Sequence, residues 1–475
     1  MLPKPSTVRA PIKINGSVFD FINGSLSSLI TATRASSATY IDSDGDLQTA
    51  ATDVMRSNEF AEHSPGGVAQ GFLIEEQRTN SVLYSNRPAV SYRLVITGVT
   101  GTFEVGEDIT TSSTGSGELV EISGTVALIF GTTGTFSGTL TGATSGATAT
   151  ISSSQERWRI SSAGTGVAPV VTDGYASSPF GPLTASRIIF DKGAGTTTGS
   201  ESTLIQLGYN TVVGQPQAAY VWLKSNTVDT YTVRLDFQGN SSNFSGTSST
   251  LTVTPTWTKF FVGLTSASDT FRSLALRLRG TLGTSDYADI LFAQMQHEQN
   301  ALFSTSEIIT TNAAETRARD IPAITDLSTI NFNASEGSVV VEFVTGPTNA
   351  SAASTVVQFN DGTTSNVLQV YAGTGTSGIF FQVVSGGVTS TAIDGGSHAP
   401  NTVYRAAVSW TANSFRFALN GTGLTEDTSG AVPIGLSALE FGRGGSNAYL
   451  NGELSKVNYY PRQLSQAQLN YLSVL

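Results

Sequence analysis

The amino-acid sequence predicts an all-β protein, and three observations lead to this fold class. First, short runs alternate apolar and polar side chains with a period of two, as in a strand that buries one face; residues 231–237 (YTVRLDF) show this most clearly. Second, the chain is rich in Ser, Thr and Gly, with 49 glycines, whereas the helix former Met occurs only three times. Third, Asn-Gly and Asp-Gly dipeptides, which are typical of tight hairpin turns, separate the runs.

Composition and charge exclude several classes of function. The 475 residues, room for roughly three domains, contain 25 Lys and Arg against 36 Asp and Glu, so we expect no basic surface for nucleic acid. Because cysteine is absent, disulfides, thiolate metal sites and cysteine nucleophiles are excluded. The N-terminus has prolines where a signal peptide would be apolar, and no run of about 18 apolar residues occurs. We therefore expect neither secretion by the standard route nor membrane insertion, and nothing implies a cofactor.

The N-terminal stretch, residues 1–79, predicts short strands joined by turns. One hairpin is expected over residues 39–49. Its Asp42, Asp44 and Asp46 resemble the first half of a calcium-binding loop, but the glycine stands between the second and third acids and no Glu closes the loop at the expected distance. We interpret this segment as an acidic turn, with a metal site at these aspartates as the weaker alternative.

Residues 93–153 form a Gly/Thr/Ser-rich island with an internal repeat. The sequence TGTF at residues 100–103 recurs at residues 133–136, and each copy ends in a strand-like run. The pattern predicts a small duplicated β-module. Because two copies are fewer than a stacked repeat array needs, we expect the module to pack on another part of the chain.

Two β-sandwiches are expected: one over residues 80–323, into which the module is inserted, and one over residues 324–475. Three tryptophans lie inside strand patterns and are interpreted as core residues: Trp222, Trp257 and Trp410. Near the C-terminus Ser465 is expected to cap a helix, with Gln468 completing a capping box. We expect this helix to close one end of the second sandwich.

Two motifs near the N-terminus resemble the opening of a widespread group of tailed-phage structural proteins. They are RASSATY (residues 34–40) and GFLIEEQRTN (residues 71–80), with an Asp-Gly turn between them. In that group the motifs lead into a carbohydrate-binding-module-like sandwich that closes with an AQ-x-E strand and a TRA exit. Here AQMQHE (residues 293–298) and TRA (residues 316–318) stand in those places, with one residue more than the usual spacing in the former.

The C-terminal block resembles a laminin-G or concanavalin-A-like jelly roll. The stretches that carry this resemblance are GSVVVEF (residues 337–343), the pair AVSW and FALNG (residues 407–421), and LNGEL with YPRQLS (residues 450–465). The resemblance implies a two-sheet fold that binds glycans or proteins through its loops.

No catalytic site is expected. A glycosidase of this fold needs two carboxylates about 5 to 9 Å apart, which alternate strand positions would bring to one face. In the last block Glu342 is isolated, and Glu426 and Asp427 are adjacent, so they would point apart. No G-x-S-x-G motif is present. The histidines lie far apart in the sequence without a partner at metal-ligand spacing: His63, His297 and His398.

Glycan contacts are the binding chemistry that the last block best supports. A sugar stacks its C–H face on an aromatic ring, while its hydroxyls seek amide, carboxylate and guanidinium groups. Four residues in or beside the Gly-rich loops of this block have these side chains: Tyr371, Arg443, Asn447 and Tyr449. Solvated loop residues are the alternative interpretation.

Together these features predict a virion structural protein of a tailed phage, a tail fibre or spike subunit made in the host cytoplasm. Residues 1–79 would dock it on other tail proteins, and its sandwiches would bind host surface glycans. Homotrimers, which the resemblance alone implies, would raise the avidity of weak single sites. Two alternatives stay open: a purely architectural component of the tail or capsid, and a surface-polysaccharide depolymerase, against which the missing β-helix repeats weigh.

Overall fold

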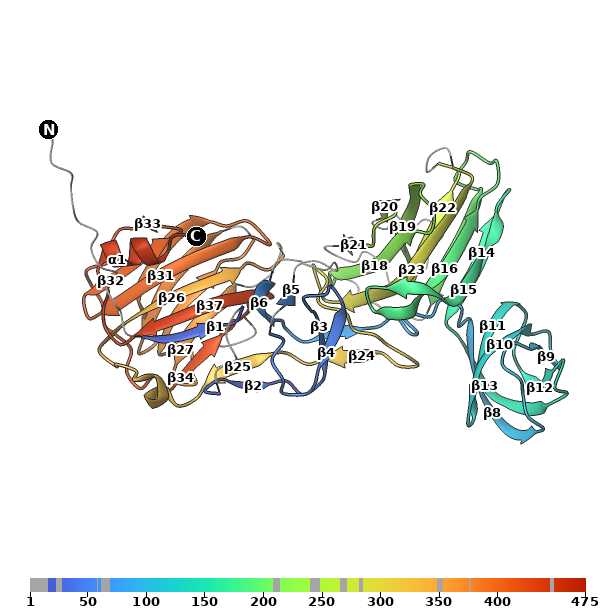
Figure 1. Ribbon diagram of the computed structural model, residues 1–475, viewed down its shortest axis with the longest axis horizontal. Coiled ribbons are helices and arrows are strands. Elements are labelled where there is room, and N and C mark those ends of the chain that lie inside the picture. Colours follow the sequence, from blue (N-terminus) through green and yellow to red (C-terminus); the bar gives the residue numbers. More distant parts are fainter. Residues whose placement is uncertain are drawn as a thin grey trace.

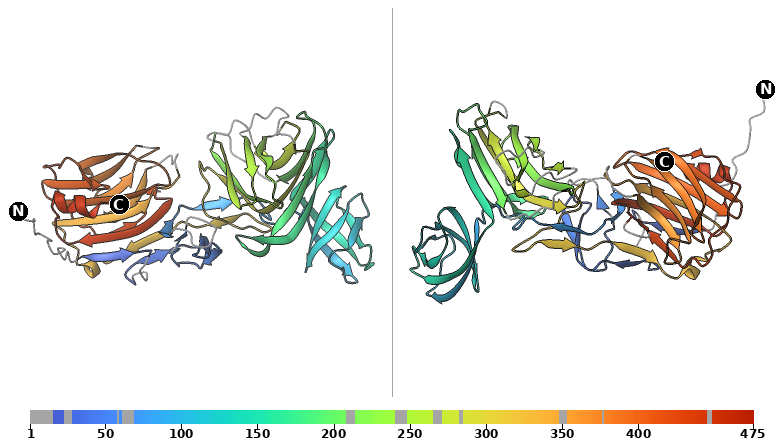
Figure 2. Two further views of the ribbon diagram at one scale, coloured as in Figure 1. Left: turned by 45° about the horizontal axis from the view of Figure 1, so that its top comes forward. Right: turned by 180° about the vertical axis from the view of Figure 1, so that it is seen from behind.

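The computed structural model describes residues 16–22, 28–57, 59–60, 69–207, 214–239, 248–264, 271–281, 285–347, 353–375, 377–444 and 448–475. These residues form a C-terminal sandwich, a middle sandwich and a small barrel in an elongated arrangement (Figure 1). A junction of short strands joins the sandwiches, and the barrel lies at the far end of the middle sandwich (Figure 2). The predicted all-β class is confirmed: one short α-helix, α1 (Gln466–Leu472), and one 3-10 turn, η1 (Leu327–Ile330), occur in the described part. None of its helices is long and apolar enough to span a membrane.

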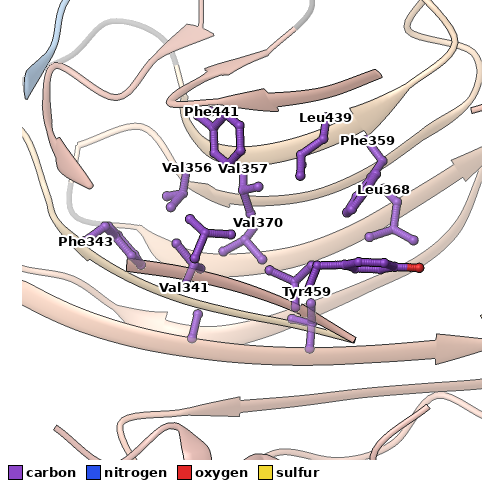
Figure 3. Close-up of a cluster of buried hydrophobic side chains, with 14 of the residues drawn as sticks. Val341, Phe343, Val356, Val357, Phe359, Leu368, Val370, Leu439, Phe441 and Tyr459 are labelled. Carbon is purple, nitrogen blue, oxygen red and sulfur yellow. The ribbon is translucent and has the colours of Figure 1, made fainter. Parts of the chain in front are cut away.

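The C-terminal sandwich packs an eight-stranded sheet against a seven-stranded one. The first has the order β33-β32-β31-β26-β37-β6-β5, with β1 also paired to β37, and the second has the order β2-β25-β34-β27-β28-β29-β30. The strands of the first sheet are β1 (Ser17–Asp20), β5 (Glu59–Phe60), β6 (Ala69–Ile74), β26 (Glu336–Val344), β31 (Val403–Thr411), β32 (Ser414–Leu419), β33 (Thr422–Gly423) and β37 (Gly452–Tyr460). Those of the second are β2 (Thr31–Thr33), β25 (Ile321–Ile324), β27 (Ser354–Asn360), β28 (Val367–Ala372), β29 (Gly378–Ser385), β30 (Val388–Ser397) and β34 (Ala438–Phe441). Between them Val341, Phe343, Val370 and Tyr459 contribute to a continuous apolar core (Figure 3).

The N-terminal segment is part of this sandwich, which differs from the predicted separate unit over residues 1–79. Strands β1 and β6 both pair with β37, and β2 pairs with β25, so the sandwich also takes β25 from the predicted 80–323 unit. The physical reason is burial, because Phe19 and Phe72 enter the C-terminal core. Gly71 allows the close approach of β6: its φ is +115°, and a Cβ there would lie 2.2 Å from the Leu454 carbonyl oxygen.

The C-terminal helix has the predicted capping box but a different position. The Ser465 side chain accepts a hydrogen bond from the Gln468 backbone, and the Gln468 side chain accepts one from the Ser465 backbone. The helix covers the outer face of the eight-stranded sheet and does not close an end of the sandwich. Small apolar residues on that face, Ala407 and Ala418, leave room for Leu469 to pack there.

The middle sandwich consists of two five-stranded sheets, ordered β14-β17-β22-β19-β20 and β15-β16-β23-β18-β21. Their strands are β14 (Trp158–Ala163), β15 (Val167–Ser178), β16 (Gly181–Asp191), β17 (Glu201–Leu207), β18 (Gln217–Ser225), β19 (Tyr231–Gly239), β20 (Ser248–Val253), β21 (Thr258–Leu264), β22 (Phe271–Arg279) and β23 (Tyr287–Gln299). The alternating run in β19 is buried on one face as predicted: Tyr231, Val233, Leu235 and Phe237.

The three tryptophans differ in their surroundings. Trp410 is fully buried in the C-terminal core, as predicted. Trp222 is buried outside the main core, on the outer face of β18, where Phe180 covers it edge-on at 6.0 Å. Trp257 is partly buried in the same small cluster.

The inserted module is a closed six-stranded barrel. Its strands are β8 (Tyr92–Thr100), β9 (Asp108–Thr111), β10 (Ser116–Ser123), β11 (Val126–Thr133), β12 (Gly138–Gly142) and β13 (Thr148–Glu156). The first copy of the repeat supplies β8 to β10 and the second supplies β11 to β13. The equivalent residues Phe103 and Phe136 both lie in the barrel core. Closure leaves no free sheet edge, and Leu128 packs against the core of the middle sandwich.

A buried charge cluster holds the junction together. Its three arginines, Arg34, Arg56 and Arg317, are at most 2% exposed. Arg34 Nη1 lies 2.9 Å from Asp320 Oδ1, and Arg56 also pairs with Asp320. Glu75 Oε2 lies 2.6 Å from Arg56 Nη1 and 3.3 Å from Arg317 Nη1. Burial alone would raise the pKa of Glu75, but the two arginines hold it at about 2, so the carboxylate is ionised.

The N-terminal motifs therefore have a structural role within this chain. Arg34 lies in RASSATY, Glu75 in GFLIEEQRTN and Arg317 in TRA, and all three meet at the junction. The surrounding short pairs are β3 (Ala38–Ile41) with β4 (Leu47–Ala50), and β7 (Arg78–Asn80) with β24 (Glu315–Arg317). Charges far apart in sequence thus connect the two sandwiches.

Candidate functional site

The outer face of the seven-stranded sheet carries an aromatic pair flanked by amides. Side chains alternate between the two faces of strands β28 and β29. The even-numbered residues of β28 and the odd-numbered residues of β29 enter the core, and the other residues face outward. Tyr371 pairs in register with Phe380, and their rings are stacked at 5.0 Å with an interplanar angle of 17°. Beside them Gln369 Nε2 donates a hydrogen bond to Gln382 Oε1 at 2.8 Å. All four side chains are half-buried.

A carboxylate completes this face. Asp394 of β30 pairs in register with Phe380, and it is exposed. Burial raises the pKa of Tyr371, and the charge of Asp394 raises it further, which places the carboxylate within electrostatic range of the phenol. The face therefore offers an apolar platform with amide donors and acceptors and one carboxylate. This combination suits a sugar ring and its hydroxyls.

The predicted residues Arg443 and Tyr449 form a small hairpin over the neighbouring strand β27. Strands β35 (Arg443–Gly444) and β36 (Ala448–Tyr449) pair, with Arg443 opposite Tyr449. The hairpin packs closely, because a Cβ at Gly444 would lie 2.1 Å from Thr355 Oγ1. Thr355 is itself the register partner of Tyr371, so the structure brings the hairpin to the edge of the aromatic platform.

These predicted residues differ in accessibility. Arg443 Nη1 lies 3.0 Å from Glu440 Oε1 and is held in that ion pair. Tyr449 is only 3% exposed, and its buried hydroxyl has no hydrogen-bond partner among the described residues. Of the two predicted tyrosines, only Tyr371 presents a partly accessible ring. Asn447 lies outside the described residues.

Sequence reasoning missed four members of this face: Phe380, Gln369, Gln382 and Asp394. Their signal is present in the alternation of residues 367–372 (VLQVYA) and 379–384 (IFFQVV), each of which turns one polar or aromatic set outward. The register between β28 and β29 cannot be seen in these patterns. It decides that Tyr371 lies opposite Phe380, and a shift of one residue would have sent both rings to the core.

The aspartates of the predicted acidic turn are used within the turn. Asp42 Oδ1 accepts hydrogen bonds from the backbone nitrogens of Asp44 and Asp46, both at 3.0 Å. Asp42 Oδ2 accepts one from Gln48 Nε2 at 2.6 Å. The geometry is that of a capped turn, and the described residues contain no group of three or more His, Asp or Glu side chains that could hold a metal ion.

The histidines do not assemble into a site in the part of the chain that the structure describes. His297 is buried, with Nδ1 2.6 Å from Ser81 Oγ and Nε2 3.0 Å from Gln217 Oε1. Burial lowers its pKa to about 3, so the ring is neutral. His398 Nδ1 lies 2.5 Å from the Ser377 carbonyl oxygen in an exposed loop, and His63 lies outside the described residues.

Comparisons with known proteins give weak structural likenesses. No protein-family profile and no curated protein matches the chain. Its structure is similar to the CBM40 of the Ruminococcus gnavus IT-sialidase bound to α2,3-sialyllactose, at 14% identity over 31% of this chain and 86% of that one, with a TM-score of 0.26. It is similar to domain 4 of the Geobacillus stearothermophilus arabinanase AbnA with arabinotriose, at 10% identity over 36% and 81%, with a TM-score of 0.28. Mouse laminin α1 domains LG4-5 match at 8% identity over 58% and 91%, with a TM-score of 0.20. At these values the likenesses do not indicate what this chain binds.

Proposed function

We propose that the protein is a tailed-phage virion component, a tail fibre or spike subunit that adheres to host surface glycans through the outer face of its C-terminal sandwich. The observation that carries the glycan part is the stacked pair of Tyr371 and Phe380 beside the hydrogen-bonded amides of Gln369 and Gln382. Stacked rings supply apolar area at little entropic cost, and amides both donate to and accept from hydroxyls. The proposal assigns adhesion and no catalytic step to this face.

The phage part of the proposal rests on the resemblance of the N-terminal motifs. The elongated arrangement of sandwiches and barrel is compatible with a protein that holds a binding face away from its attachment point (Figure 2). Because β1, β2 and β6 are built into the C-terminal sandwich, a docking surface on residues 1–79 would be shared with that sandwich. Synthesis in the host cytoplasm, a position in the virion tail and homotrimers belong to the same proposal.

A glycan array with the full chain tests the adhesive function. We expect the chain to retain a subset of surface glycans, and Tyr371→Ala to weaken that binding by about tenfold, since an aromatic contact of this kind contributes about 1 kcal/mol beyond its buried area. Tyr471→Ala is the matched control, because Tyr471 is 80% exposed on α1, on the opposite sheet. Equal losses in the two variants, or no glycan retained by the wild type, would contradict the proposal.

Immunogold labelling of intact particles tests the phage assignment separately. We expect antibodies against the chain to label the distal part of the tail. Labelling confined to the capsid would favour the architectural alternative.

A further inference from the structure

A second exposed aromatic face lies on the middle sandwich, on the outer side of the sheet β15-β16-β23-β18-β21. Tyr175 of β15 is 43% exposed and Tyr287 of β23 is 42% exposed. Strand β16 runs between them, and its Arg187 places the guanidinium carbon 5.2 Å from the centre of the Tyr175 ring. The cation–π contact holds the Tyr175 ring beside the Arg187 charge, so the face presents accessible aromatic rings next to a guanidinium.

A buried carboxylate fixes the orientation of Arg187. Arg187 Nε lies 2.9 Å from Asp289 Oδ1, and Nη2 lies 2.6 Å from Asp289 Oδ2. Asp289 is only 4% exposed, and Asn226 Nδ2 lies 3.2 Å from each of its oxygens. A two-point pair of this kind sets the plane of the guanidinium. Arg187 is therefore preorganised, so a ligand would not have to order it.

The strand register adds a second cation to the same face. Arg187 and Lys224 both pair with Leu291, from opposite sides of β23, so the three side chains point the same way. The backbones of β16 and β18 are about 10 Å apart, twice the spacing of neighbouring strands. Among the described residues no carboxylate forms an ion pair with Lys224. An acid, Asp191, stands at the other end of the face as the register partner of Tyr287, so the positive end is at Lys224.

We propose that this face, defined by Tyr175, Arg187, Tyr287 and Lys224, binds an oligosaccharide that carries a carboxylate. Sugar rings contact the two exposed tyrosines, and the sugar carboxylate pairs with Lys224 at the end away from Asp191. The row from Tyr175 to Lys224 crosses four strands, about 14 Å, which is enough for two or three sugar units. Asp289 balances the charge of Arg187, so Lys224 is the local cation that attracts an anionic glycan to a chain of net charge −11.

This site is separate from the Tyr371 face and does not depend on it. The two faces lie on different sandwiches. Loss of binding through one face, with the other intact, therefore identifies which of the two proposals fails.

Biolayer interferometry with the full chain and three acidic polymers, polygalacturonate, polysialic acid and hyaluronate, tests the inference. The highly methyl-esterified form of polygalacturonate and neutral dextran serve as uncharged probes. We expect at least one acidic polymer to bind and the uncharged probes not to bind. Lys224→Ala and Tyr287→Ala should each weaken that binding by about tenfold, the loss expected for one charge-assisted hydrogen bond or one stacked ring.

Matched variants separate the site from general effects. Arg319→Ala removes an exposed cation elsewhere, and Tyr371→Ala alters the other face; both should leave the affinity for the acidic polymer unchanged. The inference is overturned if no acidic polymer binds, if the esterified polymer binds equally well, or if Lys224→Ala and Arg319→Ala behave alike. It is also overturned if Tyr287→Ala lowers the oligomeric state in sedimentation, because the face would then be a contact between copies of the chain.

Discussion

Replacing Glu75 with Gln perturbs the centre of the junction with a single atom change. Glu75 Oε2 accepts hydrogen bonds from Arg56 Nη1 and from Ser306 Oγ, both at 2.6 Å, and Oε1 accepts one from the Ser306 backbone nitrogen at 2.8 Å. In Glu75→Gln one of these oxygens becomes an NH₂ group, which donates hydrogen bonds and so cannot accept those from Arg56 or Ser306. Among the described residues, the variant leaves Asp320 as the carboxylate within 4.0 Å of Arg56 and Arg317.

Two independent magnitudes agree on the size of the effect. The pKa of Glu75 is held at about 2 against an ordinary 4.5, which corresponds to about 3 kcal/mol of stability at pH 7. Removing one partner of a buried ion pair costs about 3 to 5 kcal/mol, because the other charge stays buried. We therefore expect Glu75→Gln to lower the free energy of unfolding of the junction by about 3 kcal/mol at pH 7.

Native-state hydrogen exchange measures this locally, which avoids assuming that a chain of several bodies unfolds in one step. The Leu73 backbone N–H donates to the Arg56 carbonyl oxygen at 3.1 Å and reports on the junction. We expect its protection to fall by the amount above, while amides of the barrel keep theirs. Glu121→Gln is the control: its ion pair with Arg87 is 47% exposed on the Glu side, so its loss should cost less than about 1 kcal/mol.

The effect of Glu75→Gln should depend on pH if the charge of Glu75 is its cause. Because the folded pKa is depressed, the stabilisation from Glu75 is present above pH 4.5 and is lost as pH falls through 2. The difference between wild type and Glu75→Gln should therefore shrink by about 2 kcal/mol between pH 7 and pH 3. A difference that is the same at both pH values, or below about 0.5 kcal/mol at pH 7, would show that the cluster does not stabilise the junction through this charge.

Three further predictions concern single residues. His297 is buried and neutral, with its pKa lowered to about 3. The free energy of unfolding of the middle sandwich should therefore fall by about 2 kcal/mol between pH 6.5 and pH 5, and continue to fall towards pH 3. Urea unfolding of His297→Gln should not show this pH dependence. Burial, and secondarily the charge of Glu75, raise the pKa of Glu453 to about 8. Glu453 therefore stabilises the fold below pH 4.5, and this stabilisation is lost as pH rises through 8. Glu453→Gln should raise the melting temperature more at pH 9 than at pH 5. Gly71→Ala should destabilise the C-terminal sandwich by at least about 2 kcal/mol, because of its positive φ and the contact with the Leu454 carbonyl; an unchanged melting temperature would contradict the close approach of β6.

Local patterns were sufficient to predict much of the secondary structure. Alternation over residues 231–237 identified a strand with one buried face, and Ser465 with Gln468 identified a helix start. These predictions succeed because a side chain's direction along a strand, or a cap's hydrogen bond, depends on residues only two or three positions away. The candidate glycan residues were predicted less well, because exposure depends on what packs above a residue. Tyr449 illustrates this, since the hairpin that carries it turns its ring inward.

Composition and local patterns are enough to show that this protein is all-β, cysteine-free and acidic, with a repeat in its insert and tight turns between short strands. Which strands pair follows from the folded structure, because every strand offers the same backbone hydrogen-bonding groups whatever its sequence. The fold placed β1 and β6 beside β37, more than 370 residues away, and brought Arg34 to Asp320 across 286 residues. Both candidate glycan faces exist for the same reason: the register between strands sets Tyr371 against Phe380 and aligns Arg187 with Lys224, and register is a property of the packed sheet.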